Sequence, residues 1–419
     1  MGRRHRQGRP VPLGSQIRKS KRRGKRIMTD AVTKLVENYI SSERYSGIEW
    51  RIAQRDDILS EGRVGYANFE QKSPIPEDAV YRIYSMTKPI ISVLALMLIE
   101  RGRLHLYDPL LAYDPRFRSL MVLRTNGAIE PANSPITVEH LLTHRAGFSY
   151  EFLLGCPIAP YYRAAGLLDN GARPFDDVMG ALAELPLAFH PGSDWRYSVA
   201  TDVLAHVIER ATGERIDDLL KKHIFDPLGM SETTFCLKDD QLPRLMAMYG
   251  NEELGRTPAL KRGAHELRPL DVSPSYPMQS KEFRRGGHGL YSTLSDYCAF
   301  VRMLLSGESD TGERLLSERT LSMMHANRLP QGHAPLRIGD IPLPGYGWNL
   351  TGRVMVDVGQ ALSTYAIKDE FGWAGAAGTY FWVDPKAEIT GVIMTQFIRS
   401  NFPLSDDMMT VFYGAVQGR

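Results

Sequence analysis

The sequence predicts an α+β (more broadly, α/β) protein with an antiparallel sheet built from both ends of the chain, flanked by the terminal helices and interrupted by a mainly helical insertion. Strand character occurs before residue 70, where apolar and polar residues alternate, and returns after residue 378 as β-rich runs. Helical periodicity with Pro- and Gly-rich loops fills the middle. The composition, 43% hydrophobic and 24% charged over 419 residues, indicates a globular chain with one large domain or two intimate ones.

The N-terminal elements follow one another closely. A helix is expected to begin at Thr29, a good N-cap residue, because apolar residues then recur at helical spacing. Two antiparallel strands are expected at Ile48–Gln54 and around Arg63–Phe69. A long helix should run from about Ser85 to Glu100, since Arg101-Gly102 supplies the cation and the glycine that helix C-termini favour.

The remaining elements divide into helices and a final strand pair. The helical patterns lie at Thr137–Leu142, Phe175–Leu185, Thr201–Ala211 and Ile216–Ile224. Tyr249–Arg284 has little periodicity and is expected to be a long surface excursion. Thr379–Val383 and Ile389–Phe397 are β-rich runs separated by the turn residues Asp384-Pro385-Lys386, and an amphipathic helix follows at Asp407–Val416.

This pattern divides the chain into three parts. Residues 28–108 and 285–419 should form the sheet domain, and residues 109–284 the helical insertion. Residues 1–27 carry eleven Lys and Arg and no acid, so they are expected to form a disordered basic arm. Because Met28 directly precedes a good helix start, translation beginning at Met28 is the favoured explanation of this arm.

Composition also excludes several classes of protein. No groove-reading motif or aromatic interleaving accompanies the basic arm, so we expect no nucleic-acid partner. The longest apolar stretch, Pro89–Ile99, is about half of what a membrane span needs. Three widely spaced cysteines do not suggest a disulfide framework or a cysteine-based zinc site, and a cytoplasmic location fits best.

The strongest chemical signal is Ser85-Met-Thr-Lys88 at the start of the long helix. Residues three apart share a helix face, so the Lys88 amine can lie beside the Ser85 hydroxyl. The helix terminus favours the oxyanion that such a nucleophile creates, and burial would lower the pKa of Lys88 until it accepts a proton. Ser-x-x-Lys alone is weak, since a capping serine and a surface lysine would look the same.

Two further segments could contribute to a site around this serine–lysine pair. Tyr197 stands in a loop just before a helix, where a neighbouring lysine would stabilise its phenolate as a general base, although a lone tyrosine is more often a packing residue. Gly372–Gly378 is a run rich in small residues before a strand. Such residues let backbones approach closely, which a backbone N–H facing an oxyanion requires.

In this order the three elements resemble the serine β-lactamase and penicillin-binding-protein superfamily, most closely its esterase branch, the family VIII carboxylesterases. The resemblance spans about Met28 to Arg419 and rests on collinear blocks beyond Ser85-x-x-Lys88. These blocks are His140–Gly147, Tyr197–Leu204, Phe225–Met230, Gly286–Thr293 and Gly378–Pro385. It implies a β-lactamase-like fold.

The resemblance implies a role for each matching residue. Ser85 would be the acylated nucleophile, Lys88 its activator, and Tyr197 the general base and later the acid for the leaving group. The backbone N–H groups of Ser85 and Ala376 would form the oxyanion hole, with Trp373, Ala374 and Gly375 lining the substrate pocket. No cofactor or metal is implied.

Two departures from the β-lactamase pattern concern the substrate. Val199 stands where those enzymes show the asparagine of Tyr-x-Asn, and Trp373-Ala374-Gly375 replaces Lys-Thr-Gly. Both losses favour a neutral, fairly apolar carboxylic ester, a small-molecule substrate. The alternatives are a β-lactamase or D-amino-acid peptidase, an acyltransferase, and a catalytically silent binding module of the same fold.

Competing signals are weaker. His140 and His144 share a helix face, yet they form no His-Glu-x-x-His and lack a third ligand, so we expect no metal site. No Gly-x-Ser-x-Gly elbow, P-loop or dinucleotide fingerprint is present. Tyr150 and Trp348 are expected near pocket loops or in the core, without a catalytic role. The oligomeric state is left open.

Overall fold

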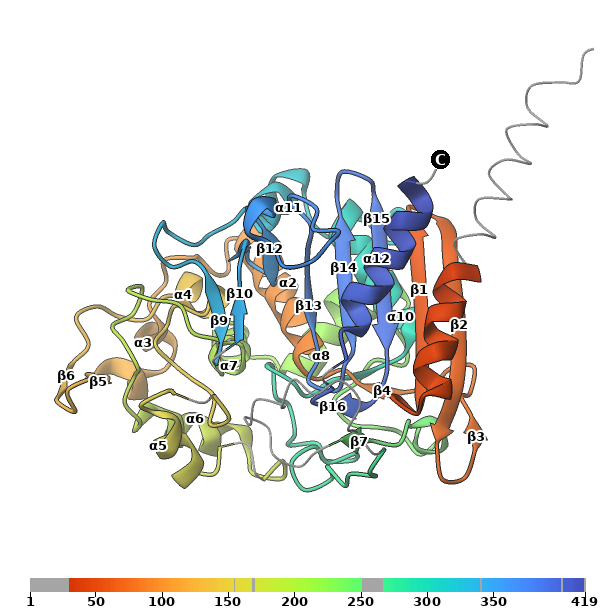
Figure 1. The fold of residues 1–419 in the computed structure, drawn as a ribbon. Coiled ribbons are helices and arrows are strands. Elements are labelled where there is room, and N and C mark those ends of the chain that lie inside the picture. Colours follow the sequence, from red (N-terminus) through yellow and green to blue (C-terminus); the bar gives the residue numbers. More distant parts are fainter. Residues whose placement is uncertain are drawn as a thin grey trace, which may run out of the picture.

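Eight antiparallel strands form the central sheet, and both halves of the chain contribute to it (Figure 1). The computed structural model describes residues 30–153, 155–167, 170–250, 267–339, 341–400 and 402–417. The strands lie in the order β11 (Tyr346–Trp348), β12 (Arg353–Met355), β13 (Phe371–Ala374), β14 (Tyr380–Asp384), β15 (Ile389–Met394), β1 (Gly47–Gln54), β2 (Asp57–Asn68) and β3 (Ser73–Pro74). The expected sheet built from both ends of the chain is thus confirmed.

Both faces of the sheet are covered by helices, because the central strands bury side chains on each side. In β14, Tyr380 and Trp382 face one core, while Phe381 and Val383 face the other. A helix over residues 30–41 and α12 (Leu404–Gln417) cover the first face (Figure 1). On the second face lie α2 (Thr87–Glu100) and α10 (Leu294–Ser306).

The middle of the chain is mainly helical, as predicted, and packs beside α2 (Figure 1). Its helices are α3 (Leu110–Tyr113), α4 (Val138–Leu142), α5 (Ala159–Ala164), α6 (Phe175–Ala183), α7 (Ala200–Thr212), α8 (Ile216–Leu220) and α9 (Asp226–Leu228). Small strand pairs complete the fold: β4 (Tyr81–Arg82) with β8 (Tyr291–Ser292), β5 (Met121–Leu123) with β6 (Ile129–Pro131), β7 (Tyr249–Gly250) with β16 (Phe397–Ile398), and β9 (Leu336–Ile338) with β10 (Ile341–Leu343). Helix α11 (Glu318–His325) follows α10.

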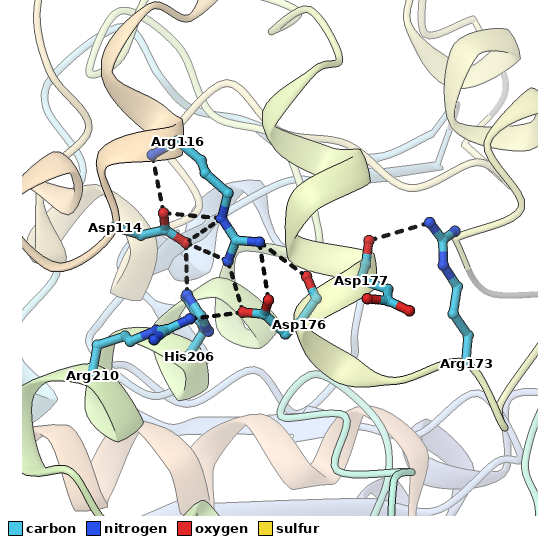
Figure 2. A network of polar contacts seen from close by, with 7 residues as sticks. All are labelled: Asp114, Arg116, Arg173, Asp176, Asp177, His206 and Arg210. Atoms are coloured by element: carbon cyan, nitrogen blue, oxygen red, sulfur yellow. Dashed lines mark hydrogen bonds and ion pairs between the residues drawn. The ribbon is translucent and has the colours of Figure 1, made fainter.

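A network of charged side chains joins three of these helical segments (Figure 2). Asp114 accepts hydrogen bonds from Arg116 and from His206 Nε2, the latter at 2.8 Å. Arg116 and Arg210 each donate to Asp176 at 2.8 Å. The network ties the Pro115–Arg118 turn to α6 and α7, so it fixes the helix that follows Tyr197.

The structure differs from the expected elements in several places, of which those around the site matter most. Gly372–Gly378, expected as a segment before a strand, begins inside β13. Ser85 lies in a 3-10 turn, Tyr84–Met86, and α2 begins only at Thr87. Strands β11 and β12 were not predicted, because three-residue strands are too short to show a period. Helix α10, which has 13 residues, was also not predicted.

Some expectations remain predictions. The basic arm and the Met28–Thr29 helix start lie outside the described residues, as does part of the 249–284 excursion. The division into a sheet domain and a helical insertion also stays a prediction. Within the described ranges, no helix combines the length and apolar character needed to cross a bilayer.

Candidate active site

Ser85 is presented by a strained turn between the sheet and α2. It is partly exposed in the Tyr84–Met86 turn, and the preceding residue, Tyr84, has a φ of +43°, which bulky residues rarely adopt. The Tyr297 hydroxyl donates to the Met86 carbonyl at 2.9 Å and anchors the turn to α10. The surrounding fold therefore holds the serine in an orientation that local preference alone would not select.

Lys88 lies one helical turn further on, with its amine aimed back at Ser85. Nζ is 3.3 Å from Ser85 Oγ, and it also donates to the Tyr150 hydroxyl at 2.8 Å and to the Gly287 carbonyl at 2.6 Å. The side chain is only 2% exposed. Burial lowers the pKa of Lys88 to about 7, and the charge of Asp202 opposes this shift. Near neutral pH, a substantial fraction of the amine is therefore unprotonated.

Tyr197 reaches the same point from the loop before α7. Lys88 Nζ lies 4.7 Å from the centre of the Tyr197 ring, and Trp373 Nε1 donates to the Tyr197 hydroxyl at 3.2 Å. Burial raises the pKa of Tyr197 above its usual range, and hydrogen bonding with Ser85 and Trp373 offsets only part of the rise. Desolvation outweighs these contacts and favours the neutral phenol in the resting site. The role of Tyr197 as a general base stays a prediction.

Aromatic rings fix the position of Tyr197. Its ring centre lies 5.0 Å from that of His144, 5.3 Å from that of Tyr150 and 5.2 Å from that of Trp373. His144 Nδ1 is 3.2 Å from Ser198 Oγ, and the ring packs among the aromatic side chains. No group of three or more possible metal ligands occurs within the described part of the chain.

Ser85 opens into a cavity of about 580 Å³. Its wall contains the three residues expected in the pocket, Trp373, Ala374 and Gly375, and also Ala376, expected in the oxyanion hole, and Tyr197. Other lining residues are mostly aromatic or aliphatic: Tyr84, Tyr150, Phe152, Tyr276, Ile338, Pro342, Leu343, Pro344, Tyr346, Leu362 and Tyr380. The cavity therefore suits an apolar ligand larger than a simple acetate ester.

The end of β13 approaches the Ser85 turn closely enough to require glycine. A Cβ at Gly375 would lie 2.5 Å from the Ile83 carbonyl oxygen and 2.1 Å from Thr379 Oγ1. This contact sets the backbone of Ala376 beside the cavity that contains Ser85. Small residues here permit the close backbone approach that an oxyanion site needs.

Three groups in the site were not identified from the sequence. Tyr150, for which no catalytic role was expected, accepts a hydrogen bond from Lys88, and His288 lines the cavity. The Gly287 carbonyl holds the Lys88 amine. By contrast, Trp348 is a core residue, since it is 2% exposed and its Nε1 donates to the Leu142 carbonyl at 3.1 Å. The one signal in the sequence for Gly287 and His288 was that both lie in the Gly286–Thr293 block, which contributes to the family resemblance.

Comparison with known proteins bears on the same region. Residues 32–408 match the family model described as Beta-lactamase. Protein Rv1367c of Mycobacterium tuberculosis is 32% identical over 365 residues, which cover 84% of this chain and 86% of the relative. Esterase EstB of Burkholderia gladioli is 28% identical over 355 residues, covering 82% and 84% of the two chains. The solved structure of "EstCE1, a hydrolase with promiscuous acyltransferase activity" aligns with a TM-score of 0.77 at 24% identity, covering 94% of this chain and 99% of the other.

Proposed function

The chain belongs to the β-lactamase family, and from that membership we propose that it hydrolyses carboxylic esters through an acyl-enzyme on Ser85. Membership confirms the resemblance found in the sequence and the prediction of a serine hydrolase. The ester as substrate and the roles of individual residues are the proposal. The observation that carries it is the buried Lys88 amine 3.3 Å from the Ser85 hydroxyl. Burial lowers the pKa of this amine to about 7, which suits a base at neutral pH.

Acylation begins when neutral Lys88 takes the proton of Ser85 as Oγ bonds to the ester carbonyl carbon. The carbonyl π electrons move to oxygen, and the N–H groups of Ser85 and Ala376 stabilise that oxyanion. When the tetrahedral intermediate collapses, the bond to the alcohol oxygen breaks and Tyr197 gives this oxygen its phenolic proton. Tyr197 then regains a proton from the Lys88 ammonium, so both groups return to their resting state.

Deacylation runs the same proton path in reverse, with water in place of the alcohol. Water passes a proton to Tyr197 as it attacks the acyl carbon, and Tyr197 passes its own proton to Lys88. Lys88 returns a proton to Ser85 as the ester bond to Oγ breaks. The raised pKa of Tyr197 suits this relay, because the resting phenol carries the proton that the alcohol needs. The sequence-based role of Tyr197 as first base thus passes to Lys88.

The cavity supports a neutral substrate. Arg353 is the only Arg or Lys among its described lining residues, and this guanidinium is ion-paired with Glu370 at 3.0 Å. It also lies 4.2 Å from the centre of the Tyr346 ring. Trp373 adds a neutral hydrogen-bond donor beside Tyr197. Among the described residues of the cavity wall, no unpaired Lys or Arg side chain faces a substrate carboxylate.

The test is the change of Ser85 to Ala. Turnover of a short-chain p-nitrophenyl ester should fall by at least about 10⁴-fold, because the nucleophile is lost. The thermal unfolding midpoint should stay unchanged, since Ser85 is a partly exposed turn residue. Mass spectrometry should show an acyl adduct on the unmodified protein and none on the variant. Retained turnover in Ser85→Ala would refute the assignment.

Acyl transfer to an alcohol is the second candidate. It is favoured by the likeness to EstCE1, a hydrolase with promiscuous acyltransferase activity. The same acyl-enzyme would serve, with an alcohol replacing water. Ester assays with and without an added alcohol separate the two outcomes, and a parallel nitrocefin assay tests lactam hydrolysis.

We also propose a reducing, cytoplasmic location, because all three cysteines are free thiols.

A further inference from the structure

Helix α7 places a buried carboxylate, Asp202, behind Lys88, and the mechanism above leaves it without a role. Asp202 is only 3% exposed. Its Oδ1 accepts the N–H of Gly287 at 3.0 Å, and the carbonyl of the same glycine accepts Lys88 Nζ at 2.6 Å. One residue therefore links the carboxylate to the amine that faces Ser85.

Gly287 fits this position only because it lacks a side chain. A Cβ there would lie 2.3 Å from Asp202 Oδ2 and 3.0 Å from the Tyr150 hydroxyl. The carboxylate and the phenol thus occupy the space that a side chain would need. This contact, together with the two hydrogen bonds, leaves the Gly287 carbonyl little freedom to move away from Lys88.

Asp202 is also the source of negative charge for this site. It is the one carboxylate that acts on Lys88 among the described residues, and burial raises its pKa while Lys88, the Gly287 N–H and Arg285 oppose the rise. The other titratable groups facing Lys88 are two phenols, Tyr150 and Tyr197, and two imidazoles, His144 and His288. Burial raises the pKa of the phenols and lowers that of the imidazoles, so all four are neutral. Arg285 is the further cation near Asp202.

The second carboxylate oxygen of Asp202, Oδ2, is buried, and no hydrogen bond from the described residues offsets its desolvation. Arg285 Nη1 is likewise buried without a hydrogen-bond partner within the described part of the chain. A buried polar atom without a partner destabilises the fold, so such atoms call for a functional explanation. An apolar residue at position 202 would avoid that cost.

We propose that Asp202 is a positioning residue for Lys88: through Gly287 it aims the amine at Ser85, and its charge sets the pH at which the amine is available as a base. This inference rests on the proposed function, because it assumes that Lys88 activates Ser85. It requires two separable effects, one from hydrogen-bond geometry and one from charge. Two substitutions at the same position distinguish them.

Asp202→Asn keeps an oxygen for the Gly287 N–H and removes the charge. Because the carboxylate favours the protonated amine, its loss should make Lys88 neutral at lower pH. The acid limb of kcat/KM for a p-nitrophenyl ester should move down by about one pH unit or more. Asp202→Ala removes the oxygen as well, so the plateau kcat should fall about tenfold or more, with KM little changed because Asp202 does not line the cavity.

Asp296→Asn is the matched control. Asp296 is another buried carboxylate, 7% exposed, which accepts the Glu232 N–H at 2.9 Å and the Thr233 hydroxyl at 2.8 Å but does not line the cavity. This variant should leave the acid limb in place, whatever it does to the thermal midpoint. An unmoved acid limb in folded Asp202→Asn overturns the inference even if Ser85→Ala is inactive. An active Ser85→Ala overturns the proposed function instead.

Discussion

Helix α7 carries two polar clusters along one face, and they differ in how completely they are satisfied. Asp202, His206 and Arg210 lie four residues apart, so they form a single row. His206 and Arg210 belong to the network of Figure 2. Asp202 faces Gly287 and the Lys88 amine. The same helix thus connects a structural cluster with the proposed catalytic one.

The charges of the network are paired. Burial alone would raise the pKa of Asp114, but hydrogen bonds and charge from Arg116 and His206 outweigh it and hold the value at about 2. No side-chain atom of the network is among the buried, unpartnered atoms found in the described residues. In the site, burial instead lowers the pKa of Lys88 to about 7, and Asp202 Oδ2 lacks a partner. Charges that are fully paired, as in the network, serve the stability of the fold. Groups whose pKa is strongly shifted by burial, as in the site, are typical of residues that exchange protons in catalysis.

Among the changes that compare the two clusters, Lys88→Met should show the largest effect on activity. It removes the base and leaves an apolar side chain of similar length, so kcat/KM for a p-nitrophenyl ester should fall by about 10³-fold or more. The thermal midpoint should hold or rise, because a desolvated amine is replaced by an apolar group.

Arg210→Met is the comparison from the other cluster. The Arg210 side chain is 48% exposed and contacts Asp176, so this variant should keep its kcat/KM. Equal losses of activity in the two variants would remove the distinction between the clusters.

Asp114→Asn should affect stability and spare catalysis. Asp114 is 4% exposed and bonded to Arg116 and His206, so losing its charge should reduce the free energy of unfolding by about 3 kcal/mol. The folded pKa of about 2 lies below the usual value of about 3.9, so this stabilisation is complete above pH ~4 and disappears as pH falls toward 2.

Urea unfolding at pH 7 and at pH 3 measures this difference. The gap between Asp114→Asn and the unmodified protein should narrow at the lower pH, while kcat/KM at pH 7 stays within about twofold. A gap that widens on acidification would contradict an ionised Asp114 in the folded state.

Tyr150→Phe should have the smallest of these effects. It removes one of the three acceptors around Lys88 Nζ, so the amine should lose part of its orientation and kcat should fall about tenfold, equivalent to about 1.4 kcal/mol. Steady-state kinetics at the pH optimum measures the change.

Tyr113→Phe provides the control for a lost phenol. Its hydroxyl donates to Asp108 Oδ2 at 2.6 Å outside the cavity, so activity should persist. A Tyr150→Phe variant as active as Tyr113→Phe would show that the Tyr150 hydroxyl does not help to orient Lys88.

Short-range features of the fold and the site were readable from the sequence. Strand β1 alternates and helix α12 is amphipathic, so their patterns were detectable, while β14, β15 and α2 are buried on all sides and were marked by their apolar runs. Strands β11 and β12 are three residues each and escaped detection. Ser85 and Lys88 were paired from helical spacing and Tyr197 was a weak candidate from its place before a helix, while the full role of Tyr197 and the choice of Ala376 came from resemblance to a family.

The sequence by itself determined the fold class, the serine–lysine pair and the family, because these depend on local periodicity and on motifs within a few residues. Only the tertiary structure decided that Tyr150, Asp202 and the Gly287 carbonyl meet at Lys88, since up to 199 positions separate these groups along the chain. It also decided the protonation states. The pKa of Lys88 and of Tyr197 follows from burial, and burial is a property of the packed molecule.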